Sequence, residues 1–192
     1  METFLVSLTT VAAAEMGDRT QLLSLVLVAR YKQPWSILAG ILLATLASHG
    51  VAGAIGASFG SVLAPRLLDA VVGVGMIGMG LWTLVPETLE NGTAIHRTNA
   101  FTATLVAFFL AEIGDKTQIA TIALAAAYAN LPVVVAGTTC GLMLAIIPVV
   151  LLGKAFADRL PMKAIHLGAA LVFTILGAVF LARATVLHGT GF

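Results

Sequence analysis

The sequence predicts an all-α, polytopic membrane protein with six transmembrane helices, arranged as two inverted three-helix repeats. Hydrophobic residues make up 59% of the 192 positions and charged residues only 10%, whereas charged residues approach about a quarter of a soluble domain. Roughly six apolar stretches are long enough to cross a bilayer, which takes about 20 residues each. The two halves of the chain also align with each other. The lipid bilayer is therefore the expected environment.

Short polar or proline-containing breaks separate the apolar stretches. They place the predicted helices near residues 4–29, 36–60, 66–86, 100–128, 133–153 and 163–187. Proline is tolerated at the start of a helix because the first N–H groups have no partner there. Four prolines fit such starts: Pro34, Pro65, Pro132 and Pro161. The net charge is only +1 and the basic residues are scattered, so no nucleic-acid surface is expected.

A constant offset of 97 residues (112 minus 15) relates the two halves of the chain. Charged and amide residues align along with the apolar ones, which composition alone does not produce. The aligned pairs include Glu15 with Glu112, Gly17 with Gly114, Asp18 with Asp115, Thr20 with Thr117, Gln21 with Gln118 and Gly40 with Gly137. We therefore divide the chain into a first repeat (1–86), a linker (87–99) and a second repeat (100–192).

Each repeat contains three spans, so the second repeat must enter the membrane from the opposite side. Inverted repeats of this kind are typical of secondary transporters. Basic residues favour the cytoplasmic side, and the loops after the first, third and fifth helices hold Arg30, Lys32, Arg97, Lys154, Arg159 and Lys163. Both termini are therefore expected outside, and the linker in the cytoplasm.

Four carboxylates lie inside predicted spans: Glu15, Asp18, Glu112 and Asp115. An acidic residue at the centre of a span costs about 3 kcal/mol, and such residues usually mark an ion pathway. On a continuous helix, Glu15, Asp18 and Gln21 form one polar stripe. Glu112, Asp115 and Gln118 repeat that stripe in the second half.

The two motifs together favour a divalent cation. Arg19 and Lys116 lie four residues after their glutamates, where an ion pair is possible, and they offset two of the four negative charges. A divalent cation would neutralise the remainder. Carboxylate and amide oxygens are hard donors that favour Ca²⁺, Mn²⁺ or Mg²⁺, and neither motif contains Cys or His. Chemistry alone leaves Mn²⁺ and Ca²⁺ unresolved, and no bound cofactor is expected.

Accessory roles are open for several polar residues near the motifs. Thr20 and Thr117 either donate hydroxyl oxygens to the cation or bond to the preceding helical turn. His49 lies in the middle of the second predicted span, where the other repeat has Ile146. It either carries a proton, or contributes an accessory ligand, or is hydrogen-bonded for packing. Gly17 and Gly114 permit close helix approach or local unwinding.

Proton–cation antiport is one expected mechanism, because crowded carboxylates repel one another once the cation leaves. Uniport driven by the membrane potential would use the same residues. Two other classes are open. An intramembrane aspartyl protease could use Asp18 and Asp115 as a dyad, and a small-solute or amino-acid exporter could hold a substrate carboxylate with Arg19 or Lys116. The negative charge of the motifs disfavours the exporter, and the protease has no evident need for the neighbouring residues.

The segments Glu15-Met16-Gly17-Asp18-Arg19-Thr20 and Glu112-Ile113-Gly114-Asp115-Lys116-Thr117 resemble the twin signatures of the GDT family of cation/proton exchangers. That family includes transmembrane protein 165 and bacterial manganese exporters of the MneA kind. The resemblance covers nearly the whole chain. It implies a transporter rather than an enzyme, with metal binding by the four carboxylates and proton-coupled export of Mn²⁺ or Ca²⁺. The short linker favours a bacterial plasma membrane.

Overall fold

The computed structural model describes residues 1–85, 99–153 and 161–186, and all regular structure in these ranges is helical. The predicted linker lies almost wholly outside the described residues, as do three of the predicted cytoplasmic bases, Arg97, Lys154 and Arg159. The helices are α1 (Glu2–Glu15), α2 (Arg19–Tyr31), α3 (Pro34–Val62), α4 (Pro65–Thr83), α5 (Ala100–Glu112), α6 (Lys116–Ala127), α7 (Leu131–Leu152) and α9 (Met162–Val186).

Four of these helices, α3, α4, α7 and α9, are long and apolar enough to cross a membrane. They correspond to the predicted helices near 36–60, 66–86, 133–153 and 163–187. Pro34 and Pro65 are the first residues of α3 and α4, which confirms the helix starts inferred from these two prolines. The chain is therefore a multi-pass helical membrane protein.

The other two predicted spans, 4–29 and 100–128, are not continuous helices, and that expectation was wrong. Each is broken at its polar motif, into α1 and α2 in the first repeat and α5 and α6 in the second. At each break a glycine has a positive φ, 84° at Gly17 and 75° at Gly114, a conformation that only glycine adopts without cost. Local unwinding, one of two roles considered for these glycines, is what the structure shows.

The first half of each broken helix packs on a long helix of the other repeat: α1 on α7, and α5 on α3. Glycine permits both crossings. A Cβ on Gly40 would lie 2.9 Å from the carbonyl oxygen of Phe101, and one on Gly137 would lie 2.7 Å from that of Phe4. Gly40 and Gly137 are equivalent in the alignment, as are Phe4 and Phe101. The two crossings therefore use equivalent residues of the duplicated sequence.

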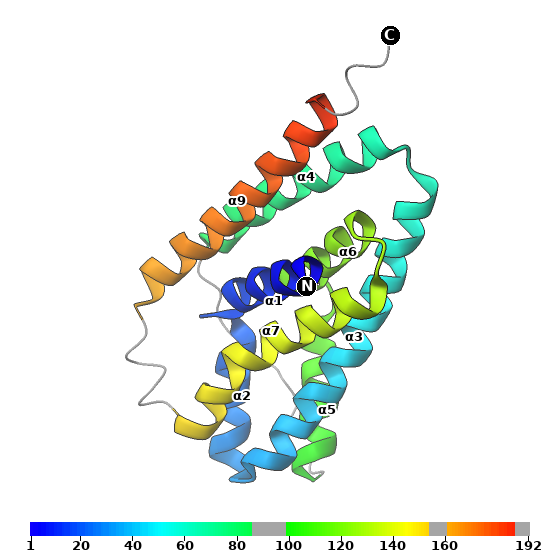
Figure 1. Cartoon of the computed structure of the whole chain (residues 1–192). Helices are drawn as coiled ribbons and strands as arrows, with labels where there is room; N and C mark the ends of the chain where they lie inside the picture. The colour runs from blue at the N-terminus through cyan, green and yellow to red at the C-terminus, as the bar shows by residue number, and fades with distance from the viewer. Residues whose placement is uncertain (86–98, 154–160, 187–192) are drawn as a thin grey trace.

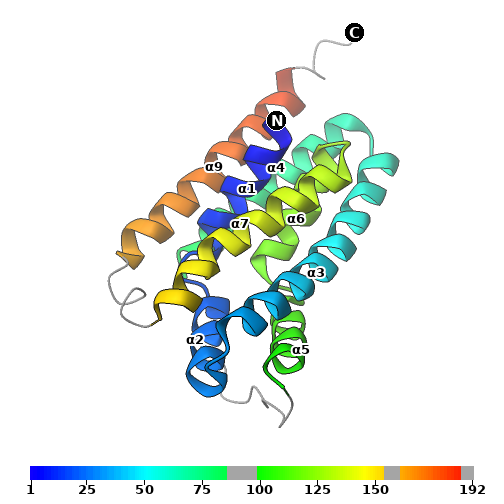
Figure 2. The same ribbon diagram turned by 60° about the horizontal axis from the view of Figure 1, so that its bottom comes forward.

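Helices α4 and α9 form a pair that runs along one side of the molecule (Figure 1). Gly73 meets Leu181 and Gly80 meets Ala170, so the two helices are antiparallel. α4 also packs on α6, and α9 on α1. Within the described residues, neither helix has comparable contacts with α2 or α5. Those two helices lie together at the opposite end of the molecule in both views (Figures 1 and 2).

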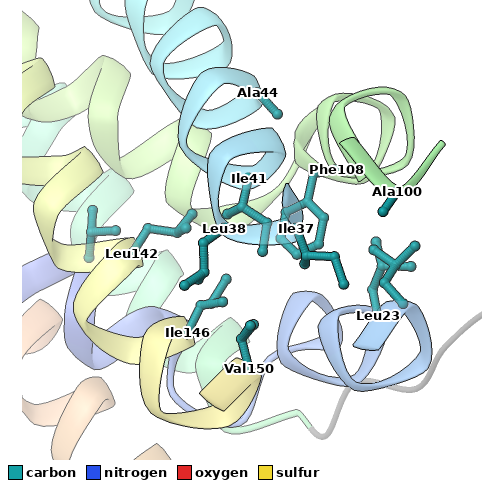
Figure 3. Close-up of a cluster of buried hydrophobic side chains, with 12 residues drawn as sticks. Leu23, Ile37, Leu38, Ile41, Ala44, Ala100, Phe108, Leu142, Ile146 and Val150 are labelled. Carbon is teal, nitrogen blue, oxygen red and sulfur yellow. The ribbon is translucent and has the colours of Figure 1, made fainter. Parts of the chain in front are cut away.

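Two apolar cores reflect this division. One joins α2, α3, α5 and α7, together with Val11 of α1, and contains Leu23, Ile41, Phe108 and Ile146 (Figure 3). The other joins α1, α4, α6, α7 and α9 and contains Met76, Leu124 and Phe173. The broken segments at the polar motifs connect helices of one core with helices of the other. The motifs therefore lie between the two cores.

Candidate cation site

Each broken helix restarts at an aspartate. Asp18 is the N-cap of α2 and Asp115 is the N-cap of α6, a position at which a side-chain oxygen accepts hydrogen bonds from otherwise unpaired N–H groups. Oδ2 of Asp18 accepts from the backbone N of Thr20 (3.3 Å) and lies 3.2 Å from its hydroxyl. Oδ2 of Asp115 accepts from the backbone N of Thr117 (3.2 Å) and from its hydroxyl (3.0 Å). The Gly-Asp-basic-Thr sequence thus builds a capped helix start in each repeat.

The basic residues of the motifs pair across the repeats. Lys116 forms an ion pair with Oδ1 of Asp18, and Arg19 Nη2 lies 3.1 Å from Oδ1 of Asp115. Arg19 also donates to the carbonyl oxygen of Ala111 at 2.9 Å. The expected i+4 geometry within one repeat does not apply, because the helix is interrupted between each glutamate and its basic residue. The ion pairs therefore connect the start of α2 with the start of α6.

Three carboxylates converge beside these pairs. Glu15, Asp18 and Asp115 each offer an oxygen, and these atoms all lie within 4.8 Å of one another. All three side chains are buried. The group draws on both repeats, and its hard oxygen donors suit a divalent cation such as Mn²⁺ or Ca²⁺.

Glu112, the fourth predicted carboxylate, has a different neighbour. Its Oε2 lies 3.4 Å from Nε2 of His49, whereas Oε1 of its equivalent, Glu15, accepts a hydrogen bond from the Thr20 hydroxyl. His49 Nδ1 also lies 3.0 Å from the hydroxyl of Thr138. His49 and Glu112 are both fully buried. Since the second repeat has Ile146 in place of His49, the site is asymmetric.

Gln21 and Gln118 hold the two breaks in the same way. The side-chain oxygen of Gln21 accepts from the Gly17 N–H at 3.0 Å, and that of Gln118 accepts from the Gly114 N–H at 2.9 Å. Their amide nitrogens reach the other repeat. Gln21 donates to the carbonyl oxygen of Ala145 at 3.0 Å, and Gln118 donates to the hydroxyl of Ser48 at 3.1 Å.

These contacts show how the glutamines and threonines of the two motifs are hydrogen-bonded. Ser48 and Ala145 are themselves 97 residues apart, so the two glutamines make equivalent cross-repeat contacts. The hydroxyls of Thr20 and Thr117 bond to carboxylates of their own motifs, and neither bonds to a preceding helical turn. A role of Thr20, Thr117, Gln21 and Gln118 as direct ligands stays a prediction.

Sequence reasoning missed two polar partners of the site. Thr138 and Ser48 each lie in an apolar segment, where a single hydroxyl does not stand out. A search for polar residues on the helices facing the motifs could have found both, but the facing helices are known only from the tertiary structure.

Buried acidic side chains from two interrupted helices of a multi-pass membrane protein define an ion transporter. Residues 3–91 and 100–187 match the family model described as "Divalent cation/proton antiporter GDT1", so the chain belongs to this family. It is thus a transporter and not an enzyme.

One relative shares 48% identity with the chain over 167 residues. It is a protein of Vibrio cholerae serotype O1 that is named "Putative manganese exporter", and the match covers 86% of this chain and 84% of the relative. No solved structure matches the chain significantly.

Proposed function

We propose that this protein exports Mn²⁺ from the cytoplasm in exchange for protons. The observation that carries the proposal is the convergence of Glu15, Asp18 and Asp115, which brings carboxylates of both repeats within 4.8 Å of one another in a buried position. The family to which the chain belongs exchanges divalent cations for protons. The name of the Vibrio cholerae relative favours manganese over calcium.

The proposed substrate site contains Glu15, Asp18, Glu112 and Asp115, with Gln21 and Gln118 as further candidate ligands. Carboxylate and amide oxygens suit Mn²⁺ and Ca²⁺ alike, so selectivity between them has to be measured. The cation is cargo, and the proposal includes no resident cofactor. His49, in contact with Glu112, is proposed as an accessory residue for proton transfer.

We further propose that each broken helix forms one span, giving six spans in two inverted three-helix repeats. The segment from Glu2 to Tyr31, which contains α1 and α2, exceeds the roughly 20 residues that a crossing needs. The equivalent contacts at Gly40 and Gly137 support a structural repeat. Both termini then lie outside a bacterial cell membrane, with the linker between the repeats in the cytoplasm.

Exchange would proceed by alternating access around a site near the membrane midplane. When the cation leaves, the crowded carboxylates repel one another, and protons that bind there remove the repulsion. The proton-loaded carrier then returns and takes up the next cation. The positive ends of the α2 and α6 helix dipoles point toward this site, since both helices begin at it, and they stabilise the carboxylates between turnovers.

The test is transport by the purified protein in lipid vesicles that contain a Mn²⁺-sensitive dye. We expect an imposed pH gradient to drive Mn²⁺ uptake against its concentration gradient, and Glu15→Gln to abolish that uptake. Parallel assays with Ca²⁺ and Mg²⁺ give the selectivity. Mn²⁺ flux that depends on the membrane potential and does not depend on the pH gradient would show uniport. The absence of any divalent flux would reject the proposed function altogether.

A further inference from the structure

In each of the two aspartates of the site, one carboxylate oxygen already accepts a hydrogen bond that caps a helix. Oδ2 of Asp18 and Oδ2 of Asp115 each accept a hydrogen bond from the backbone N–H of the threonine two residues later, and each also lies close to that threonine's hydroxyl. These bonds hold the starts of α2 and α6. A cation that binds Asp18 and Asp115 without unwinding these helices must therefore use the Oδ1 atoms.

The Oδ1 atoms are where the protein places its own positive charges. Lys116 pairs with Oδ1 of Asp18, and Arg19 pairs with Oδ1 of Asp115. An ammonium or guanidinium group and a divalent cation repel each other strongly at such short range in a buried site. The cation and the basic side chain therefore exclude each other at each aspartate.

We propose that Lys116 and Arg19 are tethered competitors of the transported cation. Each occupies the aspartate of the opposite repeat while the site is empty, and each is displaced when the divalent cation binds. This inference rests on the proposed function, because it concerns the same site. It assigns to the basic residue of each motif a role in setting the affinity for the substrate.

The two competitors differ in strength. The side chain of Lys116 is only 4% exposed, whereas that of Arg19 is 35% exposed and also holds the carbonyl oxygen of Ala111. A displaced Arg19 can move toward its exposed side, away from the cation, but a displaced Lys116 remains buried near it. Lys116 should therefore lower the affinity for the cation more than Arg19 does.

Competition of this kind also helps the cation to leave. A buried site with three carboxylates within reach of one ion would otherwise hold a divalent cation tightly. A tethered ammonium that returns to Asp18 replaces the cation during release. Because the two ion pairs also join α2 to α6, their loss when the cation binds removes one connection between the two repeats.

The experiment measures Mn²⁺ binding to the purified full chain in detergent, using the electron paramagnetic resonance signal of free Mn²⁺. Lys116→Gln should tighten binding by at least about tenfold, since a buried positive charge next to the cation is removed. Its transport in vesicles should show a lower KM together with a lower kcat, because release becomes slower. A merely structural role of Lys116 would weaken binding instead.

Arg183→Gln is the matched control. Arg183 pairs with Asp69 between α4 and α9, at 3.7 Å, and is 44% exposed. Its removal deletes a positive charge outside the site and should leave the Kd for Mn²⁺ unchanged. A similar tightening in this variant would show a general effect of net charge and would overturn the proposal.

Arg19→Gln is the second site variant, and it decides the outcome if Lys116→Gln does not fold. It should also tighten Mn²⁺ binding, but by a smaller factor. Unchanged or weaker binding in the folded site variants would overturn the competition. Such a result would leave the proposed function intact, provided that the unmodified protein exchanges Mn²⁺ for protons. If the unmodified protein lacks that exchange, the proposed function fails whatever the variants do.

Discussion

Glu15 and Glu112 occupy equivalent positions in the two repeats but have different surroundings. Glu15 contributes to the group of carboxylates within 4.8 Å of one another, whereas Glu112 contacts His49 at 3.4 Å. The sequence marked both residues as buried and acidic, since each lies inside an apolar segment. It could not show the difference between them, because that difference depends on which helix lies opposite each glutamate.

Glu15→Gln and Glu112→Gln should therefore have unequal effects on Mn²⁺ binding. Removal of the Glu15 charge should weaken binding by about tenfold or more, because it deletes one of the three converging carboxylates. Glu112→Gln should weaken binding by less. Titration of each purified variant with Mn²⁺ measures the two losses. Equal losses would mean that all four carboxylates share the cation when it is bound.

At the scale of the helix, the polar motif both interrupts the helix and restarts it. Glycine supplies the positive φ, aspartate caps the next helix, and glutamine bonds to the N–H of the glycine at the break. Prediction of a continuous helix failed because the apolar residues on both sides of the motif suit a helix, and hydropathy does not register a single residue with φ near 80°. The structure brings Glu15, Asp18 and Asp115 together, but not with the stripe geometry expected of a continuous helix.

Helix crossings in this protein depend on glycines at matched positions. Gly137 is buried where α7 crosses α1, and a Cβ there would lie 2.8 Å from Cβ of Ser7, while a Cβ on Gly75 would meet nothing within 4 Å. We expect Gly137→Ala to destabilise the protein by about 1–3 kcal/mol, as overpacking does. Gly75→Ala should be neutral or slightly stabilising, since alanine favours the helix.

Thermal unfolding of both variants in the same detergent measures this contrast. Gly137→Ala should lower the Tm by several degrees, and the Gly75 variant should not. An equal Tm for the two variants would show that α1 and α7 separate without cost, in which case the observed crossing does not stabilise the fold.

At the scale of the whole molecule, the duplicated sequence produces matched contacts and one departure from symmetry. The crossings at Gly40 and Gly137 are equivalent, as are the two ion pairs between the motifs. The pair of α4 and α9, however, packs on α6 and α1, with no comparable contact on α2 or α5 among the described residues. In a twofold-symmetric molecule, the contact of α4 with α6 would be matched by one of α9 with α2. The contact of α9 with α1 would likewise be matched by one of α4 with α5. The pair of α4 and α9 therefore covers the α1 and α6 side of the motifs and not the α2 and α5 side.

The proposed inversion of the repeats makes a direct prediction about sidedness. Gln33 and Asn130 are equivalent residues at the N-caps of α3 and α7, and inverted repeats place them on opposite sides of the membrane. In a Cys140→Ser background, a membrane-impermeant maleimide should label Asn130→Cys in intact cells, and should label Gln33→Cys only after the cells are opened. Labelling of both variants in intact cells would contradict the inversion, and the reversed pattern would contradict the orientation of the termini.

The sequence by itself determined the helical membrane class, the duplication, and the residues of the motifs. These follow from hydropathy and from repeated residues along the chain, which need no knowledge of contacts. Family membership was also foreseen from the two motifs and is confirmed by the match to both halves of the chain.

Only the tertiary structure decided how the motifs meet. It showed that each basic residue pairs with the aspartate of the other repeat, that Glu112 contacts His49, and that three carboxylates converge without it. The Glu112–His49 contact joins residues that are 63 positions apart (112 minus 49). The ion pair of Lys116 with Asp18 joins residues that are 98 positions apart (116 minus 18). They are set by the packing of helices across the repeats, which periodicity along one helix does not specify.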